Sequence, residues 1–215
     1  MTLRVPADHH AFEVLAAARL RPDPPGPAER HANPRGDHDL QFDGSPLPSR
    51  QPLKAAAVLV PVVAHDAGAT VLLTQRAPDL RDHSGQIAFP GGKVDRGETP
   101  LDAALREAEE EIGLERRHVR PLGYCDPYLS SSGYHIMPLV SVVSPALSLS
   151  PNHREVAEAF EVPLAFLMDP DNHELHARDW RGRCRQYYAI PFEARYIWGV
   201  TAGILRNLYE RLYQP

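Results

Sequence analysis

Apolar residues in this chain gather in short runs whose length suits buried β-strands. Residues 55–63 read AAAVLVPVV, a nearly continuous apolar run. A run of this length without polar alternation is typical of a strand that is covered on both faces. The turn sequence HDAG follows, and residues 69–75 (ATVLLTQ) return as a second strand. We therefore expect a strand pair at the centre of a sheet.

The second half of the chain predicts further strands and a closing helix. The pattern is apolar and β-branched in short segments, interrupted by polar turns. Strands on both sides of one internal helix, with a second helix at the end, indicate an α/β layered fold. The expected elements are strands at 118–129 and 134–144, a strand or a helix at 155–164, a hairpin of 173–180 with 183–192 across Arg181-Gly182, and a helix at 195–213.

The first 52 residues differ in pattern from the rest. Residues 8–20 (DHHAFEVLAAARL) place apolar side chains near helical spacing, which predicts a short amphipathic helix. Residues 21–52 are dense in Pro, Gly, Asp and Asn and predict an arm that crosses the surface. We expect residues 1–52 to form an N-terminal helix and Pro-rich arm, and residues 53–215 to form a single compact domain.

The internal helix is predicted by its two ends as well as by its apolar stripe. Thr99 is a good N-cap, and Pro100 suits the first helical position, where no backbone N–H is needed. Gly113 can adopt the left-handed conformation that ends a helix. The apolar side chains between them fall within one stripe at 100° per residue: Leu101, Ala104, Leu105, Ala108 and Ile112.

Acidic side chains line another face of the same helix. With Leu101 at zero, Glu107 comes at about 240°, Glu110 at about 180° and Glu111 at about 280°. Glu109 comes at about 80°, on the other flank. Three carboxylates at i, i+3 and i+4 repel one another, and a hard divalent cation such as Mg²⁺ or Mn²⁺ would remove that cost. Arg106 lies one turn from Glu110 and can orient a carboxylate.

The overall composition excludes some classes of partner. The 23 basic and 28 acidic residues give a net charge of -5, so nucleic acid is not an expected partner. No apolar run approaches eighteen residues, and the N-terminus is broken by charges and histidines, so we expect neither a membrane span nor an export signal. Cys125 and Cys184 are therefore expected to be free thiols in a cytoplasmic protein.

The spacing around the acidic helix resembles the Nudix hydrolase signature. Gly92 is followed after five residues by Glu98, and after seven more by REAEEEIGL, residues 106–114. Ala108, at an apolar position of the signature, is smaller than usual. The resemblance implies a Nudix fold, with a mixed β-sheet sandwiched between α-helices, and hydrolysis of a nucleoside diphosphate linked to another group. It implies that Glu107, Glu110 and Glu111 bind Mg²⁺ or Mn²⁺, that Glu98 supports them or adds a ligand, and that Arg106 orients the acids.

A second match lies directly upstream. Residues 72–92 contain LLTQRA, then Arg81 and Gly85 at three-residue intervals, and then FPGG. This segment resembles the one that marks the coenzyme A pyrophosphatase branch of the Nudix family. The implied reaction cleaves coenzyme A into 3′,5′-ADP and 4′-phosphopantetheine. Arg side chains grip phosphate with two hydrogen bonds, and glycines let the backbone approach a ligand. The candidate substrate-binding residues are Arg76, Arg81, His83 and Gly92.

Several alternatives stay open at this point. The general base is either Glu111 itself or a downstream acid, of which Glu155 and Glu158 are candidates. The protein hydrolyses coenzyme A, or it hydrolyses another pyrophosphate such as ADP-ribose or NADH. A third alternative is a protein that binds such a ligand without turning it over. The histidines are not expected to cluster with acids at metal spacing or to take part in catalysis, and the adjacent His9 and His10 are expected to point in different directions on their helix. The closing helix packs on the sheet or forms a homodimer contact.

Overall fold

The computed structural model describes residues 8–26, 35–40, 53–80, 82–180 and 183–214. Within these residues the strands form one mixed nine-stranded sheet and a separate antiparallel sheet of three strands. The large sheet contains β1 (Arg35–Gly36), β2 (Lys54–Val63), β3 (Thr70–Arg76), β4 (Ile87–Ala88), β5 (Gly91–Lys93), β6 (Val119–Tyr124), β7 (Tyr128–Leu129), β8 (Tyr134–Val143) and β9 (Val156–Pro163). The small sheet contains β10 (Glu174–Trp180), β11 (Arg183–Phe192) and β12 (Arg195–Trp198).

Strand β2 is the centre of the large sheet. It pairs in parallel with β8 along its whole length, and it pairs antiparallel with β3 and β5. Every residue of β2 from Val60 onward is buried, as expected for a strand covered on both faces. The run 55–63 and its return strand are therefore confirmed.

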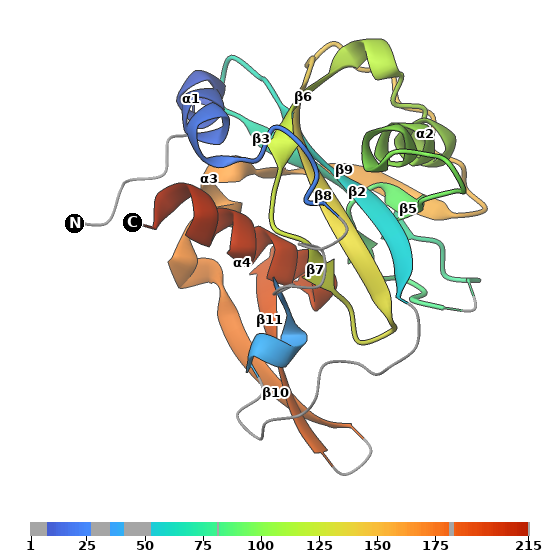
Figure 1. Cartoon of the computed structure of the whole chain (residues 1–215), viewed down its shortest axis with the longest axis vertical. Coiled ribbons are helices and arrows are strands. Elements are labelled where there is room, and N and C mark those ends of the chain that lie inside the picture. The colour runs from blue at the N-terminus through green and yellow to red at the C-terminus, as the bar shows by residue number, and fades with distance from the viewer. Residues whose placement is uncertain (1–7, 27–34, 41–52, 81, 181–182, 215) are drawn as a thin grey trace.

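Helices cover both faces of the sheet. They are α1 (His9–Arg19), α2 (Pro100–Ile112), the short α3 (Leu164–Leu167) and α4 (Val200–Tyr213), with 3-10 turns η2 (Asp37–Leu40), η3 (Arg116–His118) and η4 (Pro170–Asn172) between elements. Figure 1 shows α2 on one side of the sheet and α1 with α4 on the other.

Alternating side chains of β2 enter two separate cores, one on each side of the sheet. Val60 and Val62 pack into the core shared with α1 and α4. Leu59 and Val63 pack into the core shared with α2. The predicted α/β fold, a mixed sheet between helices, is confirmed.

The region before residue 53 contributes to this body. Phe12 and Ala16 of α1 are fully buried in the core with α4, and Arg21 pairs its backbone with Tyr124 of β6. β1 lies in the segment expected to be an arm, yet it pairs in parallel with β7 at the edge of the large sheet. Two residues are too few to show a strand pattern in a Pro-rich sequence, so this pairing was not predicted.

The closing helix begins later than expected. Arg195–Trp198 form β12, which pairs antiparallel with β11, so the prediction of a helix from Arg195 was wrong there. Aromatic and β-branched side chains favour a strand in this segment. Gly199, with a φ of 62°, then turns the chain into α4. α4 packs on the sheet, since ten of its residues are buried.

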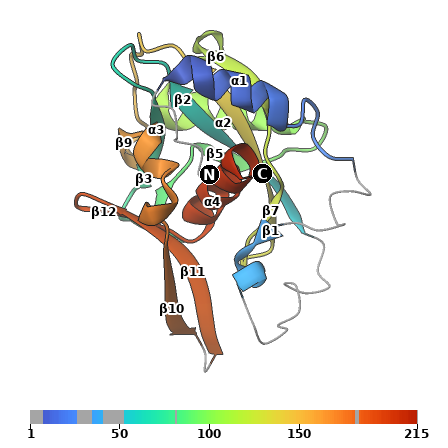
Figure 2. The same ribbon diagram turned by 90° about the vertical axis from the view of Figure 1, so that its left-hand side faces the viewer.

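Two further predictions concern the last strands. Residues 155–164, which fitted either a strand or a helix, are mostly the strand β9, which pairs with β3. β10 and β11 pair antiparallel as predicted, and Figure 2 shows this hairpin projecting from the body of the molecule. Its expected turn at Arg181-Gly182 lies outside the described residues.

Cys125 is buried, Cys184 is exposed, and both are free thiols. None of the helices in the described ranges is both long and apolar enough to cross a membrane.

Candidate active site

Helix α2 begins and ends where its sequence predicts. The hydroxyl of Thr99 accepts a hydrogen bond from the backbone N–H of Asp102 at 3.1 Å. At the other end, Gly113 is left-handed, with φ 70° and ψ 21°, and its N–H donates to the carbonyl of Glu109 at 2.9 Å. These caps fix the register of the helix and therefore the direction of every acidic side chain on it.

Three of those acids differ steeply in their exposure to solvent. Glu111 is 5% exposed, whereas the side chains of Glu107 and Glu110 are 18% and 61% exposed. We call Glu107, Glu110 and Glu111 the acid face. The acid face therefore extends from the protein interior at Glu111 to solvent at Glu110, where a ligand can reach it.

Arg106 holds the acid face together. Its Nε and Nη2 donate to the two carboxylate oxygens of Glu98 at 2.9 and 3.1 Å. Its Nη1 donates to Glu107 at 2.9 Å and to Glu110 at 3.3 Å, and Nη2 also donates to the carbonyl of Lys93 at 3.1 Å. A planar guanidinium can fix several carboxylates at once because its donors have set directions. Both oxygens of Glu98 are occupied by this arginine.

The strand β5 brings backbone directly against the acid face. Gly91 donates its N–H to Oε2 of Glu111 at 3.2 Å. A Cβ on Gly92 would overlap the carboxylate of Glu107, and one on Gly91 would overlap the backbone of β2. These two positions therefore require glycine for close approach, and the space freed at Gly92 is filled by a carboxylate.

Burial makes two of these carboxylates hard to ionise. The pKa of Glu111 is raised to about 7, chiefly by burial, with smaller upward contributions from the charges of Glu107 and Glu155. Burial likewise raises the pKa of Glu107. In contrast, the hydrogen bonds from Arg106 lower the pKa of Glu98. The acid face thus concentrates desolvated carboxylates, a state that a cation would stabilise.

The loop before β9 carries Glu155 to the acid face. Asn152 donates its backbone N–H to the carbonyl of Glu111 at 2.9 Å, so this loop is fastened to the end of α2. Glu155 is exposed, and its charge acts on both Glu107 and Glu111. Glu158, the other downstream acid, is held by two hydrogen bonds from Arg195, each 2.9 Å long. Sequence spacing gave no signal for these loop and arginine partners, because they come from distant segments.

The candidate substrate-binding residues Arg76 and His83 differ in burial and in hydrogen bonding. The Nε of Arg76 is buried and has no hydrogen-bond partner among the described residues, and its charge acts on Glu111. His83 is exposed, has a φ of 58°, and contacts Gln86 through Nδ1 at 2.9 Å. Arg81 lies outside the described residues.

A hollow of about 530 Å³ lies along the exposed side of α2. Glu110 lines it but Glu107 and Glu111 do not, so the hollow adjoins the exposed edge of the acid face. Its lining residues are Glu98, Asp102, Leu105, Arg106, Glu109, Glu110 and Arg116.

Comparison with known proteins gives the family. The model of the NUDIX domain matches residues 53–181. The chain belongs to the Nudix family. It is 39% identical over 158 residues to Nudix hydrolase NudL of Photorhabdus laumondii, across 73% of this chain and 84% of the relative. It is 40% identical over 160 residues to NudL of Yersinia pestis, across 74% and 80%.

Solved structures with the Nudix fold include RenU, a Nudix hydrolase from M. smegmatis. It has 30% sequence identity and a TM-score of 0.45, across 52% of this chain and 71% of RenU. The names of these relatives state a family and not a substrate.

Proposed function

We propose that this Nudix protein is a divalent-metal-dependent pyrophosphatase that cleaves coenzyme A into 3′,5′-ADP and 4′-phosphopantetheine. The observation that carries this proposal is that the two sequence motifs, residues 72–92 and 92–114, meet in space as well as in sequence. The segment that resembles the coenzyme A branch runs through β3, β4 and β5 and ends against the acid face, where Gly91 donates to Glu111. At its start, Arg76 acts on the same carboxylate.

The residues of the acid face fit a hard divalent ion. All the donors are carboxylate oxygens, which suit Mg²⁺ and Mn²⁺, and two of them are desolvated by burial. Glu107, Glu110 and Glu111 would hold the ion, and Glu98 would support them through Arg106. When bound, such an ion neutralises pyrophosphate oxygens and makes a water more acidic.

The chain's own residues supply position, charge and a base. Arg106 keeps the carboxylates in one place, and Gly91 orients Glu111. Arg76, Arg81 and His83 would bind phosphate oxygens, and the unpartnered Nε of Arg76 is a donor for one of them. Water attacks one phosphorus, the bridging P–O bond breaks, and a carboxylate takes the proton from the water. No covalent intermediate with the protein is needed.

Two carboxylates are candidates for the base. Glu111 is anchored by backbone, and Glu155 reaches the acid face from a loop. Replacing Glu155 with Gln separates them, because a base is needed for every turnover. Near-normal turnover of Glu155→Gln would remove Glu155 from the mechanism.

The substrate is tested by product chromatography. Coenzyme A, dephospho-coenzyme A, ADP-ribose and NADH are each incubated with the protein and Mg²⁺ or Mn²⁺. The proposal expects 3′,5′-ADP from coenzyme A, formed much faster than any product of the other three. Faster cleavage of ADP-ribose or NADH would contradict the coenzyme A assignment and leave a Nudix hydrolase of another substrate. No cleavage of any compound would contradict the hydrolase and favour a ligand-binding role.

A further inference from the structure

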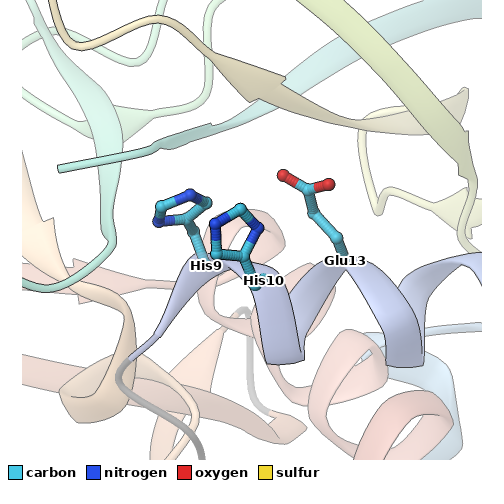
Figure 3. Close-up of side chains that lie close together, drawn as sticks. All are labelled: His9, His10 and Glu13. Atoms are coloured by element: carbon cyan, nitrogen blue, oxygen red, sulfur yellow. The ribbon is translucent and has the colours of Figure 1, made fainter. Parts of the chain in front are cut away.

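A second group of potential metal ligands lies at the start of α1, on the opposite face of the sheet from α2. His9, His10 and Glu13 each offer one ligand atom, and these atoms all lie within 4.8 Å of one another. We call these three residues the α1 cluster. Figure 3 shows the three side chains rising from the same side of the helix.

This arrangement corrects the expectation that His9 and His10 point in different directions. Their ring centroids are 4.1 Å apart. At 100° per residue, His10 lies about 100° from His9 around the helix, and Glu13 lies at about 40°, between them. Helical side chains tilt toward the N-terminus, so Glu13 leans back over the turn that carries both imidazoles. The third ligand therefore bisects the other two.

The neighbouring charges suit a cation at this position. Asp8 caps α1 by accepting the N–H of His10 at 3.0 Å, and its Oδ1 lies 4.0 Å from Nδ1 of His9. Asp8 therefore adds a negative charge beside the cluster. As the N-cap, Asp8 also offsets the positive end of the helix dipole.

Arg120 of β6 is the competing cation. Its Nη2 forms an ion pair with Oε2 of Glu13 at 2.7 Å. The carboxylate has a second oxygen, and a metal ligand can use one oxygen while a neighbouring cation holds the other. Arg120 therefore competes with a metal ion for the negative charge of Glu13.

We propose that the α1 cluster is a binding site for a borderline divalent ion of the zinc type. Two imidazoles and one carboxylate are the ligand set that such ions favour, and water would complete the coordination. The all-carboxylate acid face favours harder ions instead. The chain would then select two different metals on two faces of its sheet.

The bound ion would fasten the first turns of α1. This helix joins the main body through the buried Phe12 and Ala16. An ion that bridges His9 and His10 to Glu13 links consecutive turns, so it binds the folded helix in preference to the unfolded chain. Zinc should therefore raise the unfolding temperature of the protein as its concentration rises.

The test measures zinc affinity of the full chain by competition with a chromophoric chelator, with Mg²⁺ in excess to occupy the acid face. The wild type should bind one zinc at this site. His9→Ala and His10→Ala should each weaken it at least tenfold, whereas His118→Ala, a matched imidazole deletion elsewhere, should not. Alanine favours helix, so weaker binding would not come from loss of α1; circular dichroism and the unfolding temperature verify this.

A fourth variant tests the role of Glu13. Arg120→Gln removes the competing cation, so it should tighten zinc binding several-fold. Adventitious zinc on surface histidines would not respond in this direction. Equal affinity in the wild type and the two histidine variants, or no tightening in Arg120→Gln, would overturn the proposal. Neither result depends on pyrophosphatase activity, so the proposed function stands or falls separately.

Discussion

Helices α1 and α2 lie on opposite faces of one sheet, and each places potential metal ligands at helical spacing. On α2, the ligands are fastened by groups from other elements: Gly91 of β5 donates to Glu111, and the loop at Asn152 is bonded to the last turn. On α1, Arg120 of β6 contacts the cluster from another element, and it competes with a metal ion for Glu13. The two sets of ligands, each within about one helical turn, thus have very different surroundings.

Enclosure by neighbouring elements distinguishes the acid face from an ordinary acidic helix face. A carboxylate on an exposed helix face is solvated and loses little by repelling its neighbour. The acid face is different because β5 and the loop before β9 remove water from Glu107 and Glu111, which raises the pKa of both. In the α1 cluster the side chains of His9 and Glu13 are likewise partly enclosed, 18% and 23% exposed, so the proposed site differs from the acid face chiefly in its imidazole ligands.

The largest expected effect is at Glu111. Glu111→Gln keeps the shape of the side chain but removes its charge, so turnover should fall at least a thousandfold, about 4 kcal/mol. Glu109→Gln is the matched control, because Glu109 lies next in the acidic run but on the other flank of α2. Its turnover should stay near that of the wild type. A loss below tenfold in Glu111→Gln, about 1.4 kcal/mol, would mean that the acid face is not the catalytic centre.

The next effect tests whether α1 belongs to the same folding unit as α2. Phe12 is fully buried, so Phe12→Ala should lower the free energy of unfolding by about 3–5 kcal/mol. Val14 is 71% exposed on the same helix, and Val14→Ala should change it by less than about 0.5 kcal/mol. Urea unfolding measures both. A loss confined to a separate, early transition would show that α1 unfolds independently of the domain.

Arg106 should produce a smaller but clear effect. Arg106→Gln leaves Glu98, Glu107 and Glu110 without their shared donor, and turnover should fall about a hundredfold, ~2.7 kcal/mol. Arg116→Gln is the control, since Arg116 pairs with Asp102 on the exposed side of α2. Steady-state kinetics with saturating metal compares them. Equal losses in both variants would indicate a general charge effect, not a specific role of Arg106.

The smallest predicted effect is a pH dependence on the α4 side of the sheet. His173 contacts the carbonyl of Leu167 at 2.7 Å, and burial lowers its pKa below 6.5. The folded state therefore binds this proton less readily than the unfolded state. Stability is fully present above pH 6.5 and falls as the pH drops below that value.

Urea unfolding between pH 5 and pH 7 checks this dependence. His173→Gln cannot titrate, so its unfolding free energy should fall less on acidification than that of the wild type. The same slope in both proteins would assign the pH dependence to other groups.

Much of the site could be predicted from sequence because its signals are local. Thr99, Gly113 and the spacing of the acids lie within one helix, where caps and a 100° rotation fix the geometry. Contacts between residues of different, distant elements could not be predicted in this way. The pairing of Glu158 with Arg195 and the bond from Asn152 to Glu111 join distant segments. The strand β12 was missed because its four residues precede a strong helix pattern.

The α1 cluster is a different case. The angles that bring Glu13 between His9 and His10 were available from the sequence. The prediction that the histidines do not cluster with acids at metal spacing was therefore wrong at His9, His10 and Glu13.

The most direct test of the central claim is a Mn²⁺ titration followed by electron paramagnetic resonance. Bound Mn²⁺ loses the free-ion signal, so binding is read without substrate or turnover. Wild type and Glu109→Gln should bind Mn²⁺ with similar affinity, and Glu107→Gln should bind it at least tenfold more weakly. Binding of Mn²⁺ by Glu107→Gln as tightly as by Glu109→Gln would contradict the assignment of the acid face as the metal site.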